Sequence, residues 1–383
     1  MGFRNRSSQR HERVRRLKQA AKAVLLVGGV TTGVAMGLAA MAISRRRRNR
    51  FDFLGRVVVI TGGSRGLGFA LAEECARLGA SVAICARDDR ELRWAQESIE
   101  RQFGTEVFTH VCDVTNNDEV AEFITAVLSR FGQIDILINN AGIITVGPVE
   151  SQTLTDYQES MDIMYWGTVY PTLAVLPHMK SRGEGRIANI TSFGGKVSVP
   201  HLVPYCSAKF AAVGFSEGMR AELRKHGIKV TTVCPGLMRT GSHLNAYFKG
   251  QHRKEFALFS FGATIPFVSI NARRAARKII NAIRSGQPEL VITPQAKAAV
   301  LFHAIFPGLT TDILGLINRV LPDADREQRA RYLGKDSQTA LTESFLQKAG
   351  HQAAKEFHQN PGTYEEGPGP AEQEATGRGR VPA

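Results

Sequence analysis

Seven short apolar runs alternate with stretches of helical periodicity between residues 56 and 293, and this alternation restricts the possible folds more than any other feature of the chain. The runs are Arg56–Thr61, Ser81–Ala86, Glu106–Val111, Ile134–Asn139, Gly185–Thr191, Ile228–Cys234 and Glu289–Thr293. Strands that alternate with helices are joined as βαβ units, which place the strands parallel in one sheet. The sequence therefore predicts an α/β fold with a doubly wound, seven-stranded parallel sheet of the Rossmann type.

The chain is long enough for one large α/β domain with appendages. Its 383 residues are 43% hydrophobic, which suffices to bury a full core. We expect a basic N-terminal segment (1–22), a membrane helix (23–43), the α/β domain (51–294), a C-terminal helical extension (295–350) and a disordered tail (351–383).

The formal net charge of +14 is concentrated at the N-terminus. Residues 1–50 contain 13 Lys and Arg against the single acid Glu12, whereas residues 51–383 contain 36 basic and 34 acidic residues. A nucleic-acid-binding domain would carry positive charge on its folded surface. Because the body of the chain is nearly neutral, the sequence argues against a nucleic-acid partner.

Ala23–Ile43 is a run of 21 residues without a charge. At about 1.5 Å per residue, a helix of this length crosses a hydrocarbon core of about 30 Å. A cleavable signal peptide ends in small residues that precede its cleavage site. Here four arginines follow the apolar run instead, so a cleavable signal is not expected. We expect a single-pass transmembrane helix, and a helix lying in the plane of the membrane is the alternative.

The cysteines predict neither a disulfide framework nor a metal site. They are odd in number, far apart and set in apolar runs, namely Cys75, Cys85, Cys112, Cys206 and Cys234. We expect reduced, buried thiols in a cytosol-like compartment.

The first expected strand leads into a glycine-rich turn that precedes a helix. Glycines let the backbone turn sharply and approach a pyrophosphate, and the first N–H groups of the helix supply positive potential. The candidate dinucleotide-binding residues in this turn are Gly62, Ser64, Arg65, Gly66, Leu67 and Gly68.

The end of the second strand indicates which dinucleotide binds. An acid there would bind the ribose hydroxyls of NAD, but the strand ends at Ala86-Arg87 and the first acid is Asp88. Arg87 and Arg65 can bracket a 2′-phosphate with their planar guanidinium groups. The sequence therefore predicts NADP(H) in preference to NAD(H). A domain that consumes this cytosolic cofactor is expected to face the cytoplasm.

Other candidate ligands follow the remaining strands. They are Asp113, Asn140, Ala141, Gly142, Ser192, Pro235, Gly236 and Thr240. All of them stand at the carboxyl ends of expected strands, where open α/β sheets bind ligands.

Tyr205 and Lys209 are four residues apart in a helix expected from about Val203 to His226, so they share one face. A cation there favours the phenolate, lowers the pKa of the tyrosine and prepares it to exchange a proton with an alcohol or carbonyl oxygen. The hydroxyl of Ser192 can donate to the same oxygen. Alone, Tyr-x-x-x-Lys is a weak pattern, because an exposed helix face can carry it by chance.

Taken together, these residues make the chain resemble the short-chain dehydrogenase/reductase family over about residues 53–294. The motifs that carry the likeness are Thr61–Gly68, Asp113, Asn139–Gly142, Ser192, Tyr205 with Lys209, and Pro235-Gly236 with Thr240. The resemblance implies an NAD(P)-dependent oxidoreductase in which Tyr205 is the general acid/base. It implies that Lys209 lowers the pKa of this tyrosine and holds the nicotinamide ribose, while Ser192 positions the carbonyl.

The resemblance also assigns roles around the cofactor. It implies that Asp113 contacts the adenine ring and that Asn139–Gly142 stabilises the sheet beside the adenosine ribose. Pro235-Gly236 and Thr240 match the loop that closes on the nicotinamide carboxamide.

One position departs from the family pattern. The family usually carries Asn-x-x-Gly before the fifth strand, and that asparagine holds a water that feeds protons to the lysine. Here Gly167 is present but Met164 replaces the asparagine, and a thioether cannot donate a hydrogen bond. The alternative to an enzyme is therefore a membrane-anchored cofactor-binding scaffold or sensor with weak catalysis.

Two apolar regions indicate a lipophilic carbonyl or alcohol as substrate. The segment between Thr240 and Asn271 contains aromatic residues that either line an apolar site or cover the domain's own core, namely Phe248, Phe256, Phe259, Phe261 and Phe267. Apolar helices expected at Ala296–Phe306 and Leu309–Leu321 are each too short to span a bilayer. They can lie on the membrane, contact a second copy in a homodimer or cover the core.

Overall fold

The computed structural model describes residues 51–264, 269–324 and 329–339, together with Ala354, Glu356, Phe357 and Gln359. The chain divides into two units, Met1–Phe51 and Asp52–Ala383, and all the described helices and strands lie in the second. The expected basic segment and the expected membrane helix fall outside the described residues.

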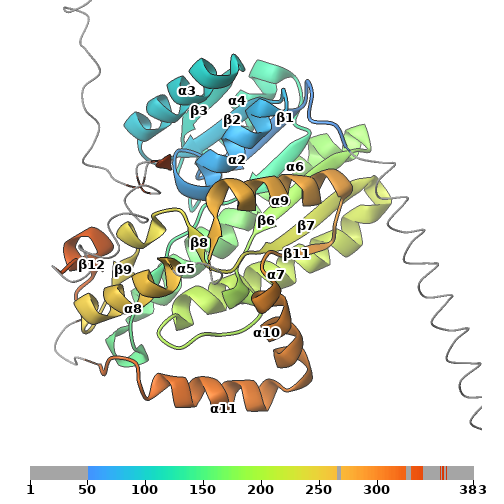
Figure 1. The fold of residues 1–383 in the computed structure, drawn as a ribbon. Coiled ribbons are helices and arrows are strands. Elements are labelled where there is room, and N and C mark those ends of the chain that lie inside the picture. Colours follow the sequence, from blue (N-terminus) through green and yellow to red (C-terminus); the bar gives the residue numbers. More distant parts are fainter. Residues whose placement is uncertain are drawn as a thin grey trace, which may run out of the picture. The chain divides into compact units, whose positions relative to one another are not determined.

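A sheet of seven strands forms the centre of the second unit, in the order β3-β2-β1-β4-β6-β7-β11 (Figure 1). The strands are β1 (Val57–Thr61), β2 (Ser81–Ala86), β3 (Val107–Val111), β4 (Ile136–Asn139), β6 (Gly185–Ile190), β7 (Ile228–Cys234) and β11 (Glu289–Val291). Every neighbouring pair is parallel. The predicted seven-stranded parallel sheet is thus confirmed, and its order reverses between β1 and β4, where such folds bind ligands.

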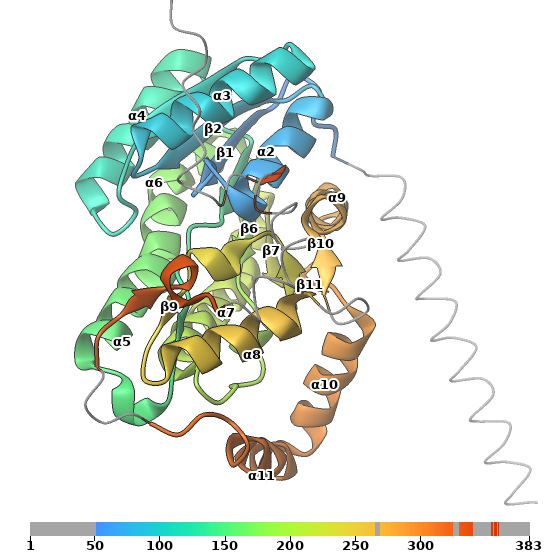
Figure 2. The same ribbon diagram turned by 60° about the vertical axis from the view of Figure 1, so that its left-hand side comes forward.

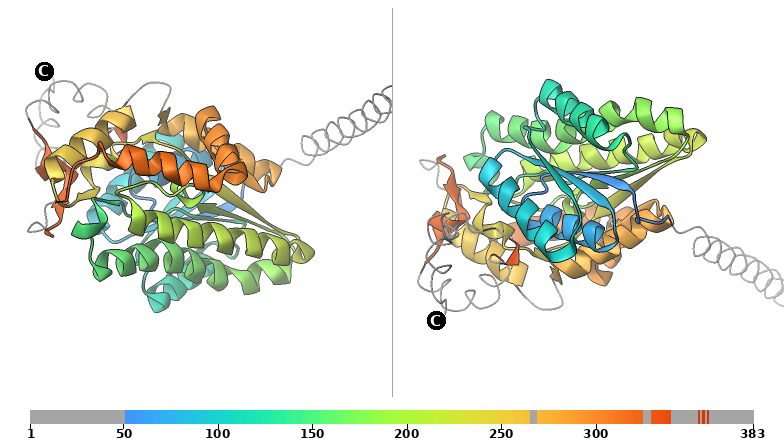
Figure 3. Two further views of the ribbon diagram at one scale, coloured as in Figure 1. Left: turned by 90° about the horizontal axis from the view of Figure 1, so that it is seen from below. Right: turned by 90° about the horizontal axis from the view of Figure 1, so that it is seen from above.

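Helices cover both faces of this sheet (Figure 3). One face carries α2 (Gly66–Arg77), α3 (Asp89–Phe103) and α9 (Ala272–Ser285), and the other carries α4 (Asn117–Phe131), α6 (Gly167–Arg182) and α7 (Val203–Leu223). Apolar side chains from the second set of helices pack on alternate residues of the strands, such as Val59, Leu137 and Ile187. The side chain of Asp88 caps α3 and that of Asn116 caps α4, because each accepts two backbone N–H groups.

A smaller layer lies beyond the carboxyl ends of the strands (Figure 2). It contains a three-stranded sheet of β5 (Thr145–Val146), β9 (Tyr247–Phe248) and β12 (Tyr332–Leu333), a two-stranded pair of β8 (Met238–Arg239) and β10 (Ile270–Asn271), and the helices α5 (Leu154–Met161) and α8 (His252–Thr264). These elements lie on the side of the main sheet where the strands that carry the candidate site residues end.

Part of the expected disordered tail is ordered. Ala354 and Phe357 are fully buried, and Gln359 is 5% exposed. Ala354 joins the apolar cluster of Phe248 and Phe256 in the smaller layer. The two apolar side chains of this polar segment thus pack on a surface that the rest of the chain provides.

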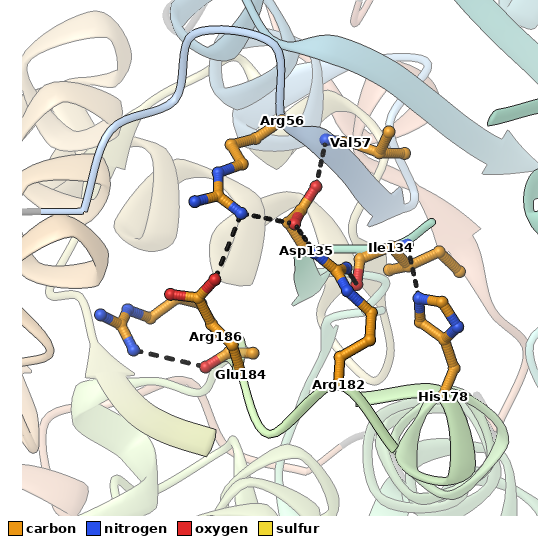
Figure 4. Close-up of polar contacts among 9 residues, drawn as sticks. Arg56, Val57, Ile134, Asp135, His178, Arg182, Glu184 and Arg186 are labelled. Carbon is orange, nitrogen blue, oxygen red and sulfur yellow. Dashed lines mark hydrogen bonds and ion pairs between the residues drawn. The ribbon is translucent and has the colours of Figure 1, made fainter. Parts of the chain in front are cut away.

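An ion-pair cluster holds the opposite edge of the sheet, at the amino ends of β1, β4 and β6 (Figure 4). Asp135 is 1% exposed and accepts hydrogen bonds from Arg56 at 2.9 Å, Arg182 at 2.8 Å and the backbone N–H of Val57 at 2.9 Å. Since this edge lies away from the carboxyl ends of the strands, the cluster stabilises the fold and is not part of the candidate site.

Two consecutive helices follow the last strand of the sheet, α10 (Pro294–Ile305) and α11 (Pro307–Asn318). No single helix among the described residues is long and apolar enough to cross a membrane. These two pass the same test only as a pair, and they are bent by 120° at the break between them.

Candidate active site

The turn between β1 and α2 has a backbone that only glycine allows at three positions. Gly62 and Gly66 have φ angles of 62° and 60°, in the left-handed region. A Cβ on Gly68 would lie 2.0 Å from the carbonyl oxygen of Gly62. The turn therefore brings bare backbone and the start of α2 together, and this arrangement fits a diphosphate. Ser64 and Leu67 are buried within the same turn.

Asn140, directly after β4, fixes the position of this turn. Its side-chain amide donates to the carbonyl oxygens of Thr61 at 3.0 Å and Gly62 at 2.9 Å. The backbone N–H groups of Asn140 and Ala141 donate to the Thr61 hydroxyl at 3.0 and 3.2 Å. The predicted amide motif is thus a brace between β4 and the glycine turn.

Ser192, Tyr205 and Lys209 come together as the sequence predicts. Ser192 follows β6, and Tyr205 and Lys209 lie in the first turns of α7. The Ser192 hydroxyl lies next to the Tyr205 phenol and lowers its pKa. It also accepts the backbone N–H of Gly194 at 3.0 Å, which orients it. The Lys209 ammonium lies 5.9 Å from the centroid of the Tyr205 ring.

The expected direction of the tyrosine pKa shift is wrong in this structure. Burial raises the pKa of Tyr205 to about 12, and the Ser192 hydroxyl acts in the opposite direction without overcoming burial. Burial also lowers the pKa of Lys209 to about 8, because the ammonium is only 5% exposed. Lys209 donates to the carbonyl oxygen of Ile190 at 2.9 Å. Desolvation of both groups therefore outweighs the attraction on which the prediction relied.

Met164 lies beside the lysine in a distorted part of the helix. Met164 belongs to a π-helical turn, Asp162–Trp166, that lies between α5 and α6. A Cβ built on Gly142 would lie 3.6 Å from the Lys209 ammonium and 3.8 Å from Cγ of Met164. An apolar thioether side chain, 1% exposed, and the Lys209 ammonium thus both lie next to Gly142.

The two arginines expected to select the cofactor differ in how closely their side chains are paired with acids. Arg87 follows β2 with an exposed side chain and its nearest acid is Asp113, at 4.0 Å. Arg65 is paired with Glu91 at 3.0 Å. Glu91, which sequence reasoning missed, is buried in α3 and also accepts the Ser64 hydroxyl at 2.9 Å.

The remaining predicted ligands are held by local hydrogen bonds. Asp113 accepts the backbone N–H and the hydroxyl of Thr115, each at 2.9 Å, which shapes the turn after β3. The Pro235 carbonyl oxygen accepts the N–H of Phe193 at 2.8 Å and so connects the loop after β7 to the residue that follows Ser192. The buried Thr240 hydroxyl accepts the N–H of Ser242 at 3.2 Å.

The C-terminal part of the chain reaches the glycine turn. The N–H of Gly66 donates to the carbonyl oxygen of Phe357 at 2.7 Å. Asn245 donates from its side-chain amide to the backbone carbonyl and the side-chain oxygen of Gln359, both at 2.7 Å. No sequence motif indicated this contact; the only available signal was an aromatic residue, Phe357, within an otherwise polar tail.

The aromatic residues of the variable segment divide between core and surface. Phe248 and Phe256 are buried and form an edge-to-face pair with ring centroids 5.4 Å apart. Phe261 is 53% exposed, and Phe267 falls outside the described residues. Phe248 and Phe256 therefore cover the core, and only part of the predicted aromatic wall remains for a substrate.

A family model described as short chain dehydrogenase matches residues 56–247. The chain belongs to the short-chain dehydrogenase family. A dehydrogenase/reductase SDR family protein 7-like from Drosophila melanogaster is 32% identical over 295 residues, which cover 74% of this chain and 88% of the relative. The family assignment makes the chain an NAD(P)-dependent oxidoreductase that acts on CH–OH groups.

Two solved structures are similar to this short-chain dehydrogenase. One is a short-chain dehydrogenase from Streptomyces avermitilis, with 28% identity and a TM-score of 0.60, covering 69% of this chain and 98% of that one. The other is L-sorbose reductase from Gluconobacter frateurii complexed with NADPH and L-sorbose, with 25% identity and a TM-score of 0.57, covering 63% and 97%.

Proposed function

We propose that this short-chain dehydrogenase interconverts a carbonyl and an alcohol on a lipophilic substrate, with NADP(H) as the preferred cofactor. The observation that carries the proposal is that the Ser192 hydroxyl and the buried Lys209 ammonium both lie next to the Tyr205 side chain. NADPH, when bound, supplies the hydride. The glycine turn, braced by Asn140, would hold the diphosphate, and the side chains of Tyr205 and Lys209 would hold the nicotinamide ribose.

Tyr205, Ser192 and Lys209 would have different roles in the transfer of the proton. The Tyr205 phenol, whose pKa burial raises to about 12, is protonated at neutral pH and is therefore suited to donate a proton to a carbonyl oxygen. Ser192 would donate a second hydrogen bond to that oxygen and hold it in place. In the reverse direction the tyrosine must lose its proton, and the Lys209 ammonium would stabilise the phenolate.

The preference for NADP(H) is supported by the surroundings of β2. Arg87 is exposed at the end of the strand. Asp88, the acid that follows it, accepts the N–H groups of Arg90 at 2.9 Å and Glu91 at 3.1 Å through one carboxylate oxygen, as the cap of α3. An exposed guanidinium at this position favours a 2′-phosphate over a 2′-hydroxyl.

A lipophilic substrate is supported by the apolar helices that begin next to the site. Ala296, at the start of α10, packs in one cluster with Val213, Cys234 and Phe193, the residue that follows the catalytic serine. The wall beyond the serine is therefore apolar and continues into a largely apolar pair of helices.

The location proposed for the enzyme is a membrane, with Ala23–Ile43 as a single-pass anchor and the catalytic domain in the cytoplasm. Support comes from the length and lack of charge of this segment. Extraction of membranes with alkaline carbonate tests the anchor. Retention of the full chain in the pellet is expected, whereas release into the supernatant would indicate an in-plane helix.

The decisive test of the chemistry is Tyr205→Phe. The variant should lose turnover with a panel of hydrophobic ketones and aldehydes while its affinity for NADPH, measured by quenching of protein fluorescence, is retained. Substantial residual turnover would remove Tyr205 from the mechanism. The scaffold alternative is favoured by Met164 alone, and it predicts NADPH binding without NADPH consumption in the unaltered protein.

A further inference from the structure

Helices α10 and α11 expose an unusual number of large apolar side chains. They are Leu301, Phe302, Ile305, Phe306, Leu309, Ile313, Leu316, Ile317 and Val320. Their exposed fractions run from 38% for Phe302 to 80% for Val320. We call this set the apolar shoulder. Contiguous exposed apolar surface of this kind marks a contact with a partner or with lipid.

The outward sides of both helices are apolar, which reverses the usual pattern of a surface helix. On α10 the single buried residue is Ala296, and Leu301 and Ile305, one turn apart, point outward. On α11 the single buried residue is Thr310, while Leu309, Ile313 and Leu316 share an exposed stripe. The shoulder therefore contributes almost nothing to the core of the protein.

The shoulder stands at the border of the fold. In Figures 1 and 2, α10 runs away from the end of β11, and α11 lies beyond it, outside the layer formed by α7 and α8. Both helices are thus positioned to meet a surface outside the protein.

Charge and geometry identify this surface as a lipid bilayer. Asp312 is the only acid between Pro294 and Leu321, whereas basic residues stand near the two ends, Lys297 and Arg319, and both are exposed. Thr311 and Asn318, both exposed, lie on the side of α11 opposite the apolar stripe, whereas Asp312 and Arg319 lie at one margin of the stripe. An apolar stripe opposite a polar side, with basic residues at the margins, is the pattern of a helix that lies in the headgroup region.

The bend between the helices excludes a straight span. Each helix has 12 residues, or about 18 Å at the usual helical rise, which is shorter than the hydrocarbon core. The 120° angle places apolar side chains along two arms rather than on one flat face. Such a surface fits the soft interior of one leaflet better than the single groove of a second copy.

We propose that the apolar shoulder inserts into one leaflet of a membrane, independently of the N-terminal segment. The contact does not depend on the catalytic proposal, because it rests only on the exposure and charge of α10 and α11.

The depth of a label on the full-length chain tests the proposal. All five native cysteines are buried, so a single new surface cysteine can be labelled selectively. An NBD group, whose emission rises in apolar surroundings, is attached to the cysteine of Leu316→Cys in the apolar shoulder. Arg101→Cys, on the far helix α3 with a side chain that is 80% exposed, is the matched control. Both labelled chains are mixed with vesicles of phosphatidylcholine and phosphatidylserine, with nitroxide groups either on the acyl chains or on the headgroups.

Insertion predicts a several-fold rise in emission from position 316, and quenching by acyl-chain nitroxides. The emission of the label at position 101 should stay at the value measured without vesicles, even when the N-terminal segment holds the chain on the vesicles. Two results would overturn the proposal. In the first, the protein sediments with the vesicles but the emission of the label at position 316 is not quenched. The other is a rise that depends on protein concentration without lipid, which would identify a second copy as the occupant.

Discussion

The backbone N–H of Gly66 donates to the carbonyl oxygen of Phe357 at 2.7 Å, across nearly 300 residues of sequence. Gly66 opens α2, and the N–H groups at the start of this helix are those expected to meet a diphosphate. The carbonyl of Phe357 therefore occupies a donor that the cofactor would use, and the Gln359 side chain lies 2.3 Å from the position that a Gly66 Cβ would take.

Removal of this competing carbonyl should strengthen cofactor binding. For a chain that ends at Gly350, we expect the Kd for NADPH to fall by about 5- to 30-fold, as the loss of one or two hydrogen bonds of about 1 kcal/mol each predicts. Asn245→Ala, which removes both bonds to Gln359, should act in the same direction to a smaller extent. Fluorescence titration measures both. A rise in Kd would instead make the segment a cover that the bound cofactor needs.

Release of Arg65 from Glu91 should sharpen cofactor selection. Glu91→Gln keeps the shape of the side chain but removes the charge that faces Arg65 at 3.0 Å. The freed guanidinium would attract a 2′-phosphate more strongly, so the ratio of the Kd for NADH to that for NADPH should rise several-fold. Arg65→Ala and Arg87→Ala are the controls and should lower this ratio. An unchanged ratio in all three variants would remove these arginines from the selection of the cofactor.

An amide in place of Met164 should raise turnover. Met164→Asn would bring a donor and an acceptor close to Lys209, where a water could be held, and we expect kcat to rise several-fold with little change in KM. Met164→Leu is the matched control and should leave kcat near that of the unaltered protein. If both substitutions reduce kcat equally, the apolar packing of this position matters more than its proton supply.

The buried Lys209 ammonium should destabilise the fold at neutral pH. Its pKa falls from 10.5 to about 8, so the unfolded chain binds more protons than the folded one between these values and stability rises with pH across this window. Lys209→Met should abolish turnover and stabilise the protein at pH 7 by about 1–2 kcal/mol, after the cost of leaving the Ile190 carbonyl unpaired is subtracted. Urea denaturation from pH 7 to pH 11 should show this advantage vanish. Destabilisation at pH 7 would contradict it.

The repeating features of the fold could be read from the sequence because they depend on local patterns. The strand at Ser81–Ala86 was predicted with its observed bounds, since its apolar run is closed by polar residues at both ends. Ser192, Tyr205 and Lys209 meet because parallel strands deliver their carboxyl ends to one edge, and this follows from topology alone.

Two kinds of feature could not be predicted from the sequence. One kind depends on contacts between segments that are far apart in the chain, and the other depends on the balance of two large, opposing free-energy contributions. The hydrogen bond between the Gly66 N–H and the Phe357 carbonyl oxygen joins two segments whose contact no periodic pattern in the sequence indicates. Glu91 reads as an ordinary acid in the first turn of a helix until the fold buries it against Ser64. The pKa of Tyr205 moved opposite to the expectation, because desolvation depends on the depth of burial, which the spacing of Tyr205 and Lys209 does not encode.

The packing of Ala296 on Phe193 has a kinetic consequence. It places the start of α10, the helix that carries part of the apolar shoulder, against the residue that follows Ser192. If the shoulder lies in a leaflet, an oily substrate reaches the serine by lateral diffusion and never enters bulk water. The quantity that saturates such an enzyme is the mole fraction of substrate among the lipids, so dilution of the substrate with inert lipid slows turnover even when its total amount is constant.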